Sequence, residues 1–313
     1  MSDLLGPAYA AARWGWYLAA FLVLGASSYA PFFFRSATGF QGTYPELAPG
    51  LSRRAARLGM VGALALLGFA LIRLWLQSRT LLDPEEPLSR EFLGAVLGSG
   101  WGRGWKWQTG LALLGALGFT IARAGSRVGW IASLVAAAGL ALTTGMTGHA
   151  VTRQSGAAGW LLDAIHVGAG GIWLGGLAVM TLAGLAVCRT LESARRPQAL
   201  RLLVADFSRK ALIAAPLTVG FGGWLGARYL GWTWPLRFTE SGYGWVLAAK
   251  VGVVAVVGAV GAYNWRILQS RLTEPRGESR LQRSTVLELG FGIVLLGITA
   301  VLVALPIPEE MRR

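Results

Sequence analysis

Long runs of apolar residues alternate with short polar segments along the whole chain. A helix that crosses a lipid bilayer needs about 20 mainly apolar residues, because each residue adds about 1.5 Å along the helix axis. Eight runs approach or exceed this length, at residues 14–34, 55–77, 107–123, 128–150, 157–187, 208–229, 243–266 and 284–305. The pattern therefore predicts an all-α, polytopic membrane helix bundle with about eight transmembrane helices.

The composition agrees with a membrane protein. Hydrophobic residues make up 54% of the chain and charged residues only 14%, whereas soluble domains carry about 25% charged residues. The 14 tryptophans and 44 glycines suit membrane interfaces and close helix packing. The net charge of +14 would suit nucleic acid, but the basic residues lie in loops between apolar runs. We therefore expect membrane lipids, and no nucleic acid, as partners.

Basic residues are concentrated in every second loop. More than half of the 29 lysines and arginines follow the first, third, fifth and seventh runs. Because loops rich in Lys and Arg remain cytoplasmic, both termini are predicted on the outer, periplasmic side of the cell inner (cytoplasmic) membrane. Met1-Ser2-Asp3 lacks the basic start of a signal peptide, so we expect no cleaved leader.

The longest predicted outer segment covers residues 78–106. Its later part, Phe92 to Trp107, suits an interfacial helix because its three last tryptophans favour the lipid headgroup region. The N-terminal transmembrane helices and this outer loop form a first predicted unit, residues 1–127. The single cysteine, Cys188, excludes an internal disulfide and any cysteine-rich metal site.

The chain has two histidines, and they lie on either side of one predicted hairpin. Met146 and His149 are three residues apart, as are Asp163 and His166, so each pair shares a helix face. Ionisable groups are costly in hydrocarbon and therefore indicate function. A thioether with imidazole suits Cu(I), and imidazole with carboxylate tolerates Cu(II). These four residues are the predicted copper ligands at the outer mouth of the hairpin.

The two histidines are expected at different depths. If the turn is centred in the connecting loop, His166 lies six residues deeper than His149, which is about 9 Å. They would then form successive stations rather than two ligands of one rigid ion. Structural roles remain open for each residue: His166 as a hydrogen bond between helices, Met146 as core packing, and Asp163 as a partner of Arg153 or a helix cap.

Three further polar groups lie in the later apolar runs. Lys250 is about seven residues into the seventh run, Asn264 is near its cytoplasmic end, and Glu288 is near the cytoplasmic start of the eighth. Asn264 and Glu288 could therefore meet. In the structural interpretation Glu288 pairs with Arg266 or Arg283, and Lys250 extends towards the membrane surface. In the functional one, Lys250 is a gate or a counter-charge to the carboxylate of the hairpin.

A set of short motifs follows in order along the second part of the chain. The motifs are Gly148-His149-Ala150, Leu162-Asp163-Ala164-Ile165-His166, Ile172-Trp173-Leu174-Gly175-Gly176, Asp206-Phe207-Ser208, Gly242-Tyr243-Gly244 with Lys250, Asn264-Trp265-Arg266, Glu288 and Pro306-Ile307-Pro308. In this order they resemble the CopD family, copper resistance protein D. The resemblance covers residues 128–308, a second predicted unit that is followed by a short tail, 309–313.

The resemblance implies an integral membrane protein that moves copper, as Cu⁺ or Cu²⁺, across the cytoplasmic membrane in import or resistance. It implies functional roles for seven residues, the last four as supporting or pathway residues: His149, Asp163, His166, Trp173, Lys250, Asn264 and Glu288. Met146 is added on the chemical grounds given above. The family also implies a separate periplasmic CopC-like copper donor, because no such domain is fused to this chain.

Two other functions remain open. A b-type haem redox protein would use His149 and His166 on one iron, which the stagger of about 9 Å disfavours. A structural subunit of a larger membrane complex would keep the fold without copper chemistry. The sequence has neither a Gly-x-x-x-x-Gly-Lys-Ser/Thr nucleotide motif nor a Gly-x-Ser-x-Gly motif. We therefore do not expect an enzyme.

Overall fold

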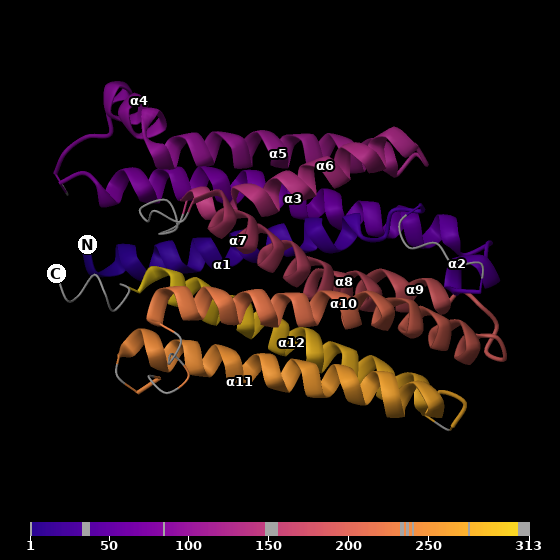
Figure 1. The fold of residues 1–313 in the computed structure, drawn as a ribbon. Helices are drawn as coiled ribbons and strands as arrows, with labels where there is room; N and C mark the ends of the chain where they lie inside the picture. The colour runs from indigo at the N-terminus through magenta and orange to yellow at the C-terminus, as the bar shows by residue number, and fades with distance from the viewer. Residues whose placement is uncertain are drawn as a thin grey trace.

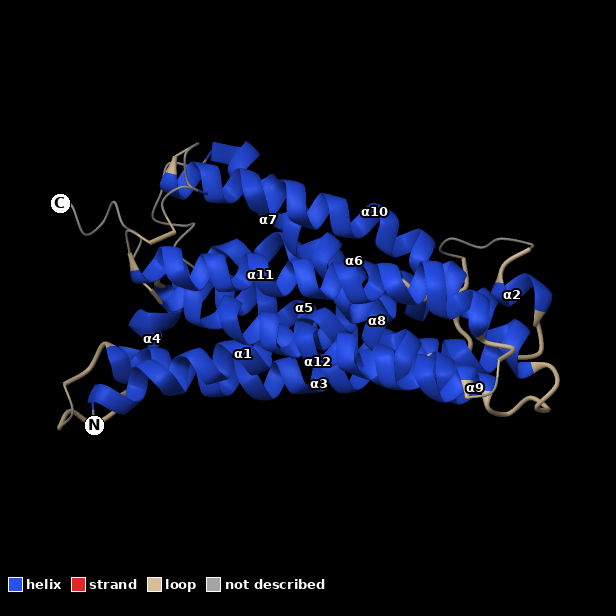
Figure 2. Cartoon of the chain, turned by 90° about the horizontal axis from the view of Figure 1, so that it is seen from below, coloured by secondary structure: helices blue, strands red, loops and turns tan. Residues whose placement is uncertain are grey.

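The computed structural model describes residues 2–32, 38–83, 85–147, 156–231, 235, 238–239, 241–274 and 276–305. Long helices lie roughly parallel to one another and form an elongated bundle (Figure 1). Figure 2 shows helices joined by loops, with no strand in the described ranges. The chain is therefore an all-α bundle, as predicted.

The helices follow the order of the predicted apolar runs. In chain order the α-helices are α1 (Ser2–Ser27), α2 (Phe40–Thr43), α3 (Ala48–Thr80), α4 (Arg90–Gly98), α5 (Gly100–Ala122), α6 (Arg127–Thr143), α7 (Gly156–Gly170), α8 (Gly176–Val179), α9 (Leu185–Cys188), α10 (Arg196–Leu230), α11 (Gly242–Tyr263) and α12 (Gly277–Ala304). Short 3₁₀ or π segments adjoin them: η1 (Thr144–Thr147), η3 (Gly171–Gly175), η4 (Met180–Gly184), η6 (Asn264–Leu268) and η7 (Gln269–Arg271).

Five helical segments of the described chain are long and apolar enough to cross a membrane. They are Ala48–Thr80, Arg127–Thr147, Gly159–Cys188, Gly242–Arg271 and Gly277–Ala304. The helices α1, α5 and α10 pack alongside these segments. With the family assignment reported below, these features make the chain a multi-pass membrane protein, whereas the number of eight crossings stays a prediction.

The outer segment differs in detail from the predicted one. The interfacial helix expected from Phe92 to Trp107 is divided at Ser99, and the three tryptophans lie in α5 rather than in α4. The hydroxyl of Ser99 accepts a hydrogen bond from the amide of Gly102 at 3.1 Å and so caps α5. The loop between the long helices α3 and α5 is therefore shorter than the predicted segment, 78–106.

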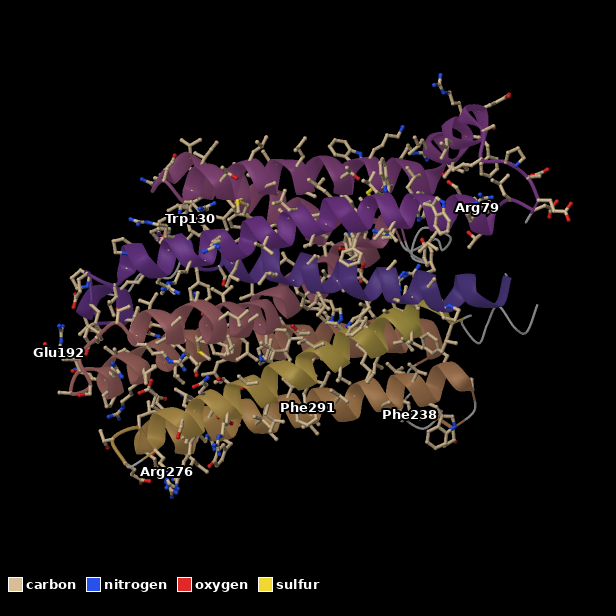
Figure 3. All side chains as sticks on the ribbon, turned by 180° about the vertical axis from the view of Figure 1, so that it is seen from behind. Arg79, Trp130, Glu192, Phe238, Arg276 and Phe291 are labelled. Carbon is tan, nitrogen blue, oxygen red and sulfur yellow. The ribbon has the colours of Figure 1, made fainter. Side chains whose placement is uncertain are left out.

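The two ends of the bundle carry different segments. The start of α1, the end of α12 and the start of α7 lie at one end, whereas α2 and α9 lie at the other (Figure 1). Figure 3 shows Arg79 at the first of these ends and Glu192 and Arg276 at the opposite one. We call them the outer and inner ends, following the orientation predicted from the basic residues. The arrangement of the helices is the same whichever end faces outward.

The helix that runs from α7 through η3, α8 and η4 to α9 is the centre of the bundle. Its span is 72% buried, whereas the span that begins with α11 is only 6% buried. At η3 this central helix meets α1 backbone to backbone. A Cβ atom on Gly25 would overlap the carbonyl group of Gly175, and one on Gly175 would overlap the carbonyl oxygen of Phe21. Glycine at both positions therefore permits the contact.

Candidate copper-handling site

Two of the predicted site residues, Asp163 and His166, lie one turn apart on α7, in the outer half of the bundle. His166 is half-buried, and its Nδ1 lies 2.8 Å from the backbone carbonyl oxygen of Thr218 on α10. A carbonyl oxygen can only accept a hydrogen bond, so Nδ1 carries the proton and donates it. The second ring nitrogen, Nε2, then has its lone pair available, which is the arrangement of a metal-binding imidazole with a backbone partner.

A glycine on α10 makes room for this imidazole. A Cβ atom on Gly222 would lie 2.8 Å from Cε1 and 3.1 Å from Nδ1 of His166. A Cβ atom on Gly170, four residues after His166, would lie 3.6 Å from Cγ2 of Thr218. Small residues on both helices therefore let α7 and α10 approach closely enough for a ring-to-backbone hydrogen bond.

Lys250 of α11 brings a positive charge to the same region. It lies near enough to Asp163 and to His166 to interact electrostatically with both. Asp163 is seven residues and Lys250 eight residues from the outer starts of their helices, so both lie about 10–12 Å along the helix axis from those starts. The structure thus brings Asp163 and His166 of α7 within electrostatic range of Lys250 on α11, and His166 also contacts the Thr218 carbonyl of α10.

The outer pair of predicted ligands is placed only in part. Met146 lies in η1 and is half-buried, and a Cβ atom on Gly104 of α5 would lie 2.8 Å from its own Cβ. The segment η1 is therefore packed tightly on α5. His149 lies outside the described residues, as does Arg153. The grouping of Met146 and His149 with Asp163 and His166 stays a prediction.

The part of the chain that the structure describes holds no group of three or more His, Cys, Asp or Glu side chains suited to a metal ion. Asp163 and His166 would therefore need a further donor of another kind or from outside the described residues. A methionine thioether and a second imidazole are such donors.

The site residues predicted from the sequence did not include Arg73, a buried arginine near the outer end. Arg73 of α3 is only 3% exposed. Its guanidinium donates to Oε1 of Gln108 at 3.0 Å and to the hydroxyl of Thr147 at 2.9 Å, and it lies over the ring of Trp16 at 4.9 Å. Thr147 is two residues before His149, so this network fixes the start of the histidine-bearing loop. An arginine within an apolar run is the sequence signal that indicates it.

Two predicted residues meet in the inner half of the bundle. The side-chain amide of Asn264 donates to Oε2 of Glu288 at 2.8 Å, and both residues are buried. The alternative pairing of Glu288 with Arg266 or Arg283 is absent from the described residues, where both arginines are exposed and Arg266 lies over the ring of Trp265. Asn264 begins the π segment η6, a geometry often found at functional positions.

The remaining predicted pathway residue, Trp173, is 5% exposed within η3 and belongs to the core.

A second buried cation lies closer to the inner end and was not predicted. Lys210 donates to the carbonyl oxygen of Ser28 at 2.7 Å, and its Nζ lies 3.9 Å from the centre of the Tyr29 ring. Cys188, at the inner end of α9, is buried. Polar groups therefore occur at several depths along the bundle.

Comparisons with known proteins agree with this arrangement. A family model described as copper resistance protein D-like, N-terminal domain, matches residues 1–160, which is half of the chain, and a model described as copper resistance protein D matches residues 201–302. The division predicted at residue 127 stays a prediction.

A copper transport protein of Bacillus subtilis (strain 168), CutJ, is 28% identical over 181 residues, which cover 58% of this chain and 31% of CutJ. The aligned part is thus about a third of that relative's length. No solved structure matches the chain. Since the family models cover both parts of the bundle, the chain belongs to the copper resistance protein D family.

Proposed function

We propose that this protein binds copper in the outer half of the bundle and passes it inward across the cytoplasmic membrane, without catalysing a reaction. Membership of a copper resistance family supports copper as the cargo. The name of the relative, copper transport protein, supports movement rather than storage. The same apolar helices that cross the bilayer carry the candidate ligands.

The observation that carries the proposal is the hydrogen bond from Nδ1 of His166 to the Thr218 carbonyl. It orients the ring and leaves Nε2 as the basic nitrogen, which is a good donor to either copper oxidation state. Asp163 lies on the same face of α7 and supplies a negative charge. Met146 and His149 would receive the ion first, at the outer mouth.

Lys250 balances the negative charge of Asp163 before copper arrives. Opposite charges attract strongly in a low-dielectric region, and a second cation entering it is repelled by the ammonium group. Copper would therefore displace Lys250 from Asp163 as it binds, so Lys250 acts as a gate. From His166 the ion would move along the central helix, past Trp173, towards Asn264 and Glu288.

A separate periplasmic CopC-like protein is the proposed donor of copper to the outer mouth. Transfer between two proteins suits ligands that are few and near the surface, because the ion can change ligands one at a time. Assembly with further subunits into a larger membrane complex is compatible with the exposed apolar faces of α3 and α11.

The test is the metal and haem content of the purified full chain, compared with a His149→Ala/His166→Ala variant after copper loading. We expect copper in the first and its loss in the second. Trp160→Ala is a control on the same helix, since Trp160 is 43% exposed, and it should retain copper. Equal copper in wild type and double variant would overturn the proposal, and a Soret band lost in the double variant would establish haem in its place.

A further inference from the structure

The buried pair of Asn264 and Glu288 lies well inward from the histidine. Gly292 of α12 faces Leu174 of the central helix, at 3.3 Å from a Cβ atom placed on the glycine. Leu174 is eight residues inward from His166, and Glu288 is one further turn inward along α12. The two positions are therefore separated by about 18 Å along the bundle. The pair is a second polar site, distinct from the outer one.

Glu288 has a carboxyl group in an apolar environment. It is 2% exposed, and in the described part of the chain it forms no salt bridge; Asn264, itself 4% exposed, is its hydrogen-bond partner. An ionised carboxylate without a cation is costly at such a position. A neutral, protonated carboxyl group avoids that cost.

The ionisable groups on the elements packed against α12 are engaged elsewhere or exposed. On α11, Lys250 interacts with Asp163, and Tyr263 is 46% exposed. Tyr17 of α1 lies near Arg73 and Asp163, and Arg266 of η6 is exposed above Trp265. Cys188 of α9 is buried closer to the inner end and lies near Glu278.

The charged residues of α12 itself between its start and Glu288 are Glu278, Arg280 and Arg283. Arg280 and Arg283 are exposed to solvent, and Glu278 is partly exposed beside Arg189. The two arginines therefore do not neutralise the buried carboxyl group.

The hydrogen bonds of the pair leave an acceptor that a proton on Glu288 could satisfy. Nδ2 of Asn264 donates to Oε2 of Glu288, but Oδ1 of Asn264 is buried and receives no hydrogen bond. An ionised carboxylate cannot donate to it, whereas a protonated one has an O–H that can. A carboxylic acid and a primary amide can pair through two such hydrogen bonds. Protonation of Glu288 thus satisfies the one unpaired acceptor of its partner.

A glycine keeps the required space beside the second carboxyl oxygen. A Cβ atom on Gly261, one turn before Asn264, would lie 2.9 Å from Oε1 of Glu288. The backbone around Asn264 is π-helical, which sets the amide at an irregular position on the α11–η6 helix. Local backbone geometry and side-chain space therefore both favour this pair.

We propose that Asn264 and Glu288 form a proton-binding site, and that copper moving inward displaces this proton. The displaced proton leaves the O–H of Glu288, whose electron pair stays on the carboxylate, and reaches water at the inner end. The carboxylate then faces the copper cation, so the positive charge added to the apolar region falls by one. The binding of the proton stands by itself, whereas its coupling to copper rests on the proposed transport function.

Infrared spectra test proton binding without copper. Purified full chain should show the carbonyl band of a protonated carboxyl group, lost in Glu288→Gln and retained in Glu278→Gln, because the Glu278 side chain is 41% exposed and lies 3.9 Å from Arg189. Asn264→Leu should shift this band, because the acid loses its amide partner. The same band in wild type and Glu288→Gln would overturn the proton site.

Vesicles loaded with a pH-sensitive dye test the coupling. Wild type should acidify the compartment that receives copper, and Glu288→Gln should lose this response while still binding copper at the histidine site. Gly261→Ala, which crowds Oε1, serves as a second variant and should weaken the same response. Unchanged proton release in both variants would overturn the coupling. Absence of copper uptake by wild type, with the infrared band present, would overturn the transport function and leave the proton site.

Discussion

At the residue scale, the position of the His166 ring depends on Gly222, because a side chain at residue 222 would occupy space next to the ring. We predict that Gly222→Ala displaces the imidazole from the Thr218 carbonyl, because the new methyl group would lie 2.8 Å from Cε1. Loss of such a supporting hydrogen bond typically weakens metal affinity by about 10- to 100-fold. Copper affinity, measured by competition with a chelator, checks this.

The neighbouring residue provides a matched control. A Cβ atom on Gly223 would meet no atom within 4 Å, so Gly223→Ala adds the same methyl group to the same helix without touching His166. Both substitutions raise helix propensity by about 1 kcal/mol. Equal copper affinity in the two variants would show that the orientation of His166 does not matter for binding.

Arg73 supports a prediction about stability. Arg73→Ala removes the donor to Gln108 and leaves its buried Oε1 unpaired, at a cost of about 1–3 kcal/mol. Arg54→Ala, on an exposed position of the same helix, should change stability by less than about 0.5 kcal/mol. Denaturant unfolding in detergent measures both. A similar loss in the two variants would indicate that removal of any arginine from α3 is harmful and that the network is not responsible.

Some of the site was predictable from residue spacing alone. The pairing of Asp163 with His166 follows from helical periodicity, and the meeting of Asn264 and Glu288 follows from their equal depth in consecutive antiparallel helices. The partner of His166 is a backbone carbonyl 52 residues away. A carbonyl group is present at every residue, so the sequence holds no signal that singles out Thr218.

At the scale of the helices, the contact between α1 and η3 depends on two glycines. We predict that Gly25→Ala and Gly175→Ala each prevent correct packing, since the added methyl groups would overlap backbone atoms that cannot move independently. Overpacking typically costs about 1–3 kcal/mol and more where the backbone is blocked. The yield of monodisperse protein in size-exclusion chromatography measures the effect.

Gly68→Ala on α3 controls for the loss of a glycine from a membrane helix. A Cβ atom at Gly68 would meet no atom within 4 Å. Its yield should equal that of wild type. Normal yields for Gly25→Ala and Gly175→Ala would mean that α1 and η3 lie further apart than described.

Hydropathy predicted the existence of the helices better than their ends. Each of the eight apolar runs corresponds to a helix within the described residues. The sequence placed the start of one helix at residue 208, but α10 begins at Arg196. Its first turns carry charged residues, including the ion pair of Asp206 and Arg209, and therefore lack an apolar signal. Local helix formation continues beyond the bilayer, where hydropathy gives no information.

At the scale of the whole molecule, the predicted orientation has a direct test. In a Cys188→Ala background, which removes the natural thiol, an impermeant maleimide should label Glu86→Cys in intact spheroplasts. Glu192→Cys should react only after the membrane is opened, because Glu192 lies at the opposite end of the bundle (Figure 3). Both glutamates are exposed, so accessibility differs only by side. The reverse labelling would invert the proposed direction of transport.

The backbone contact between Gly25 and Gly175 also concerns how the protein is made. The first helix leaves the ribosome about 150 residues before its partner, which at 5–20 residues per second is a delay of roughly 8–30 s. During this interval α1 can pair with α3, its neighbour in sequence and in space, but its glycine-bearing surface remains uncovered. The newly inserted chain therefore passes through a period in which that surface is open to membrane chaperones or to misassembly with other helices.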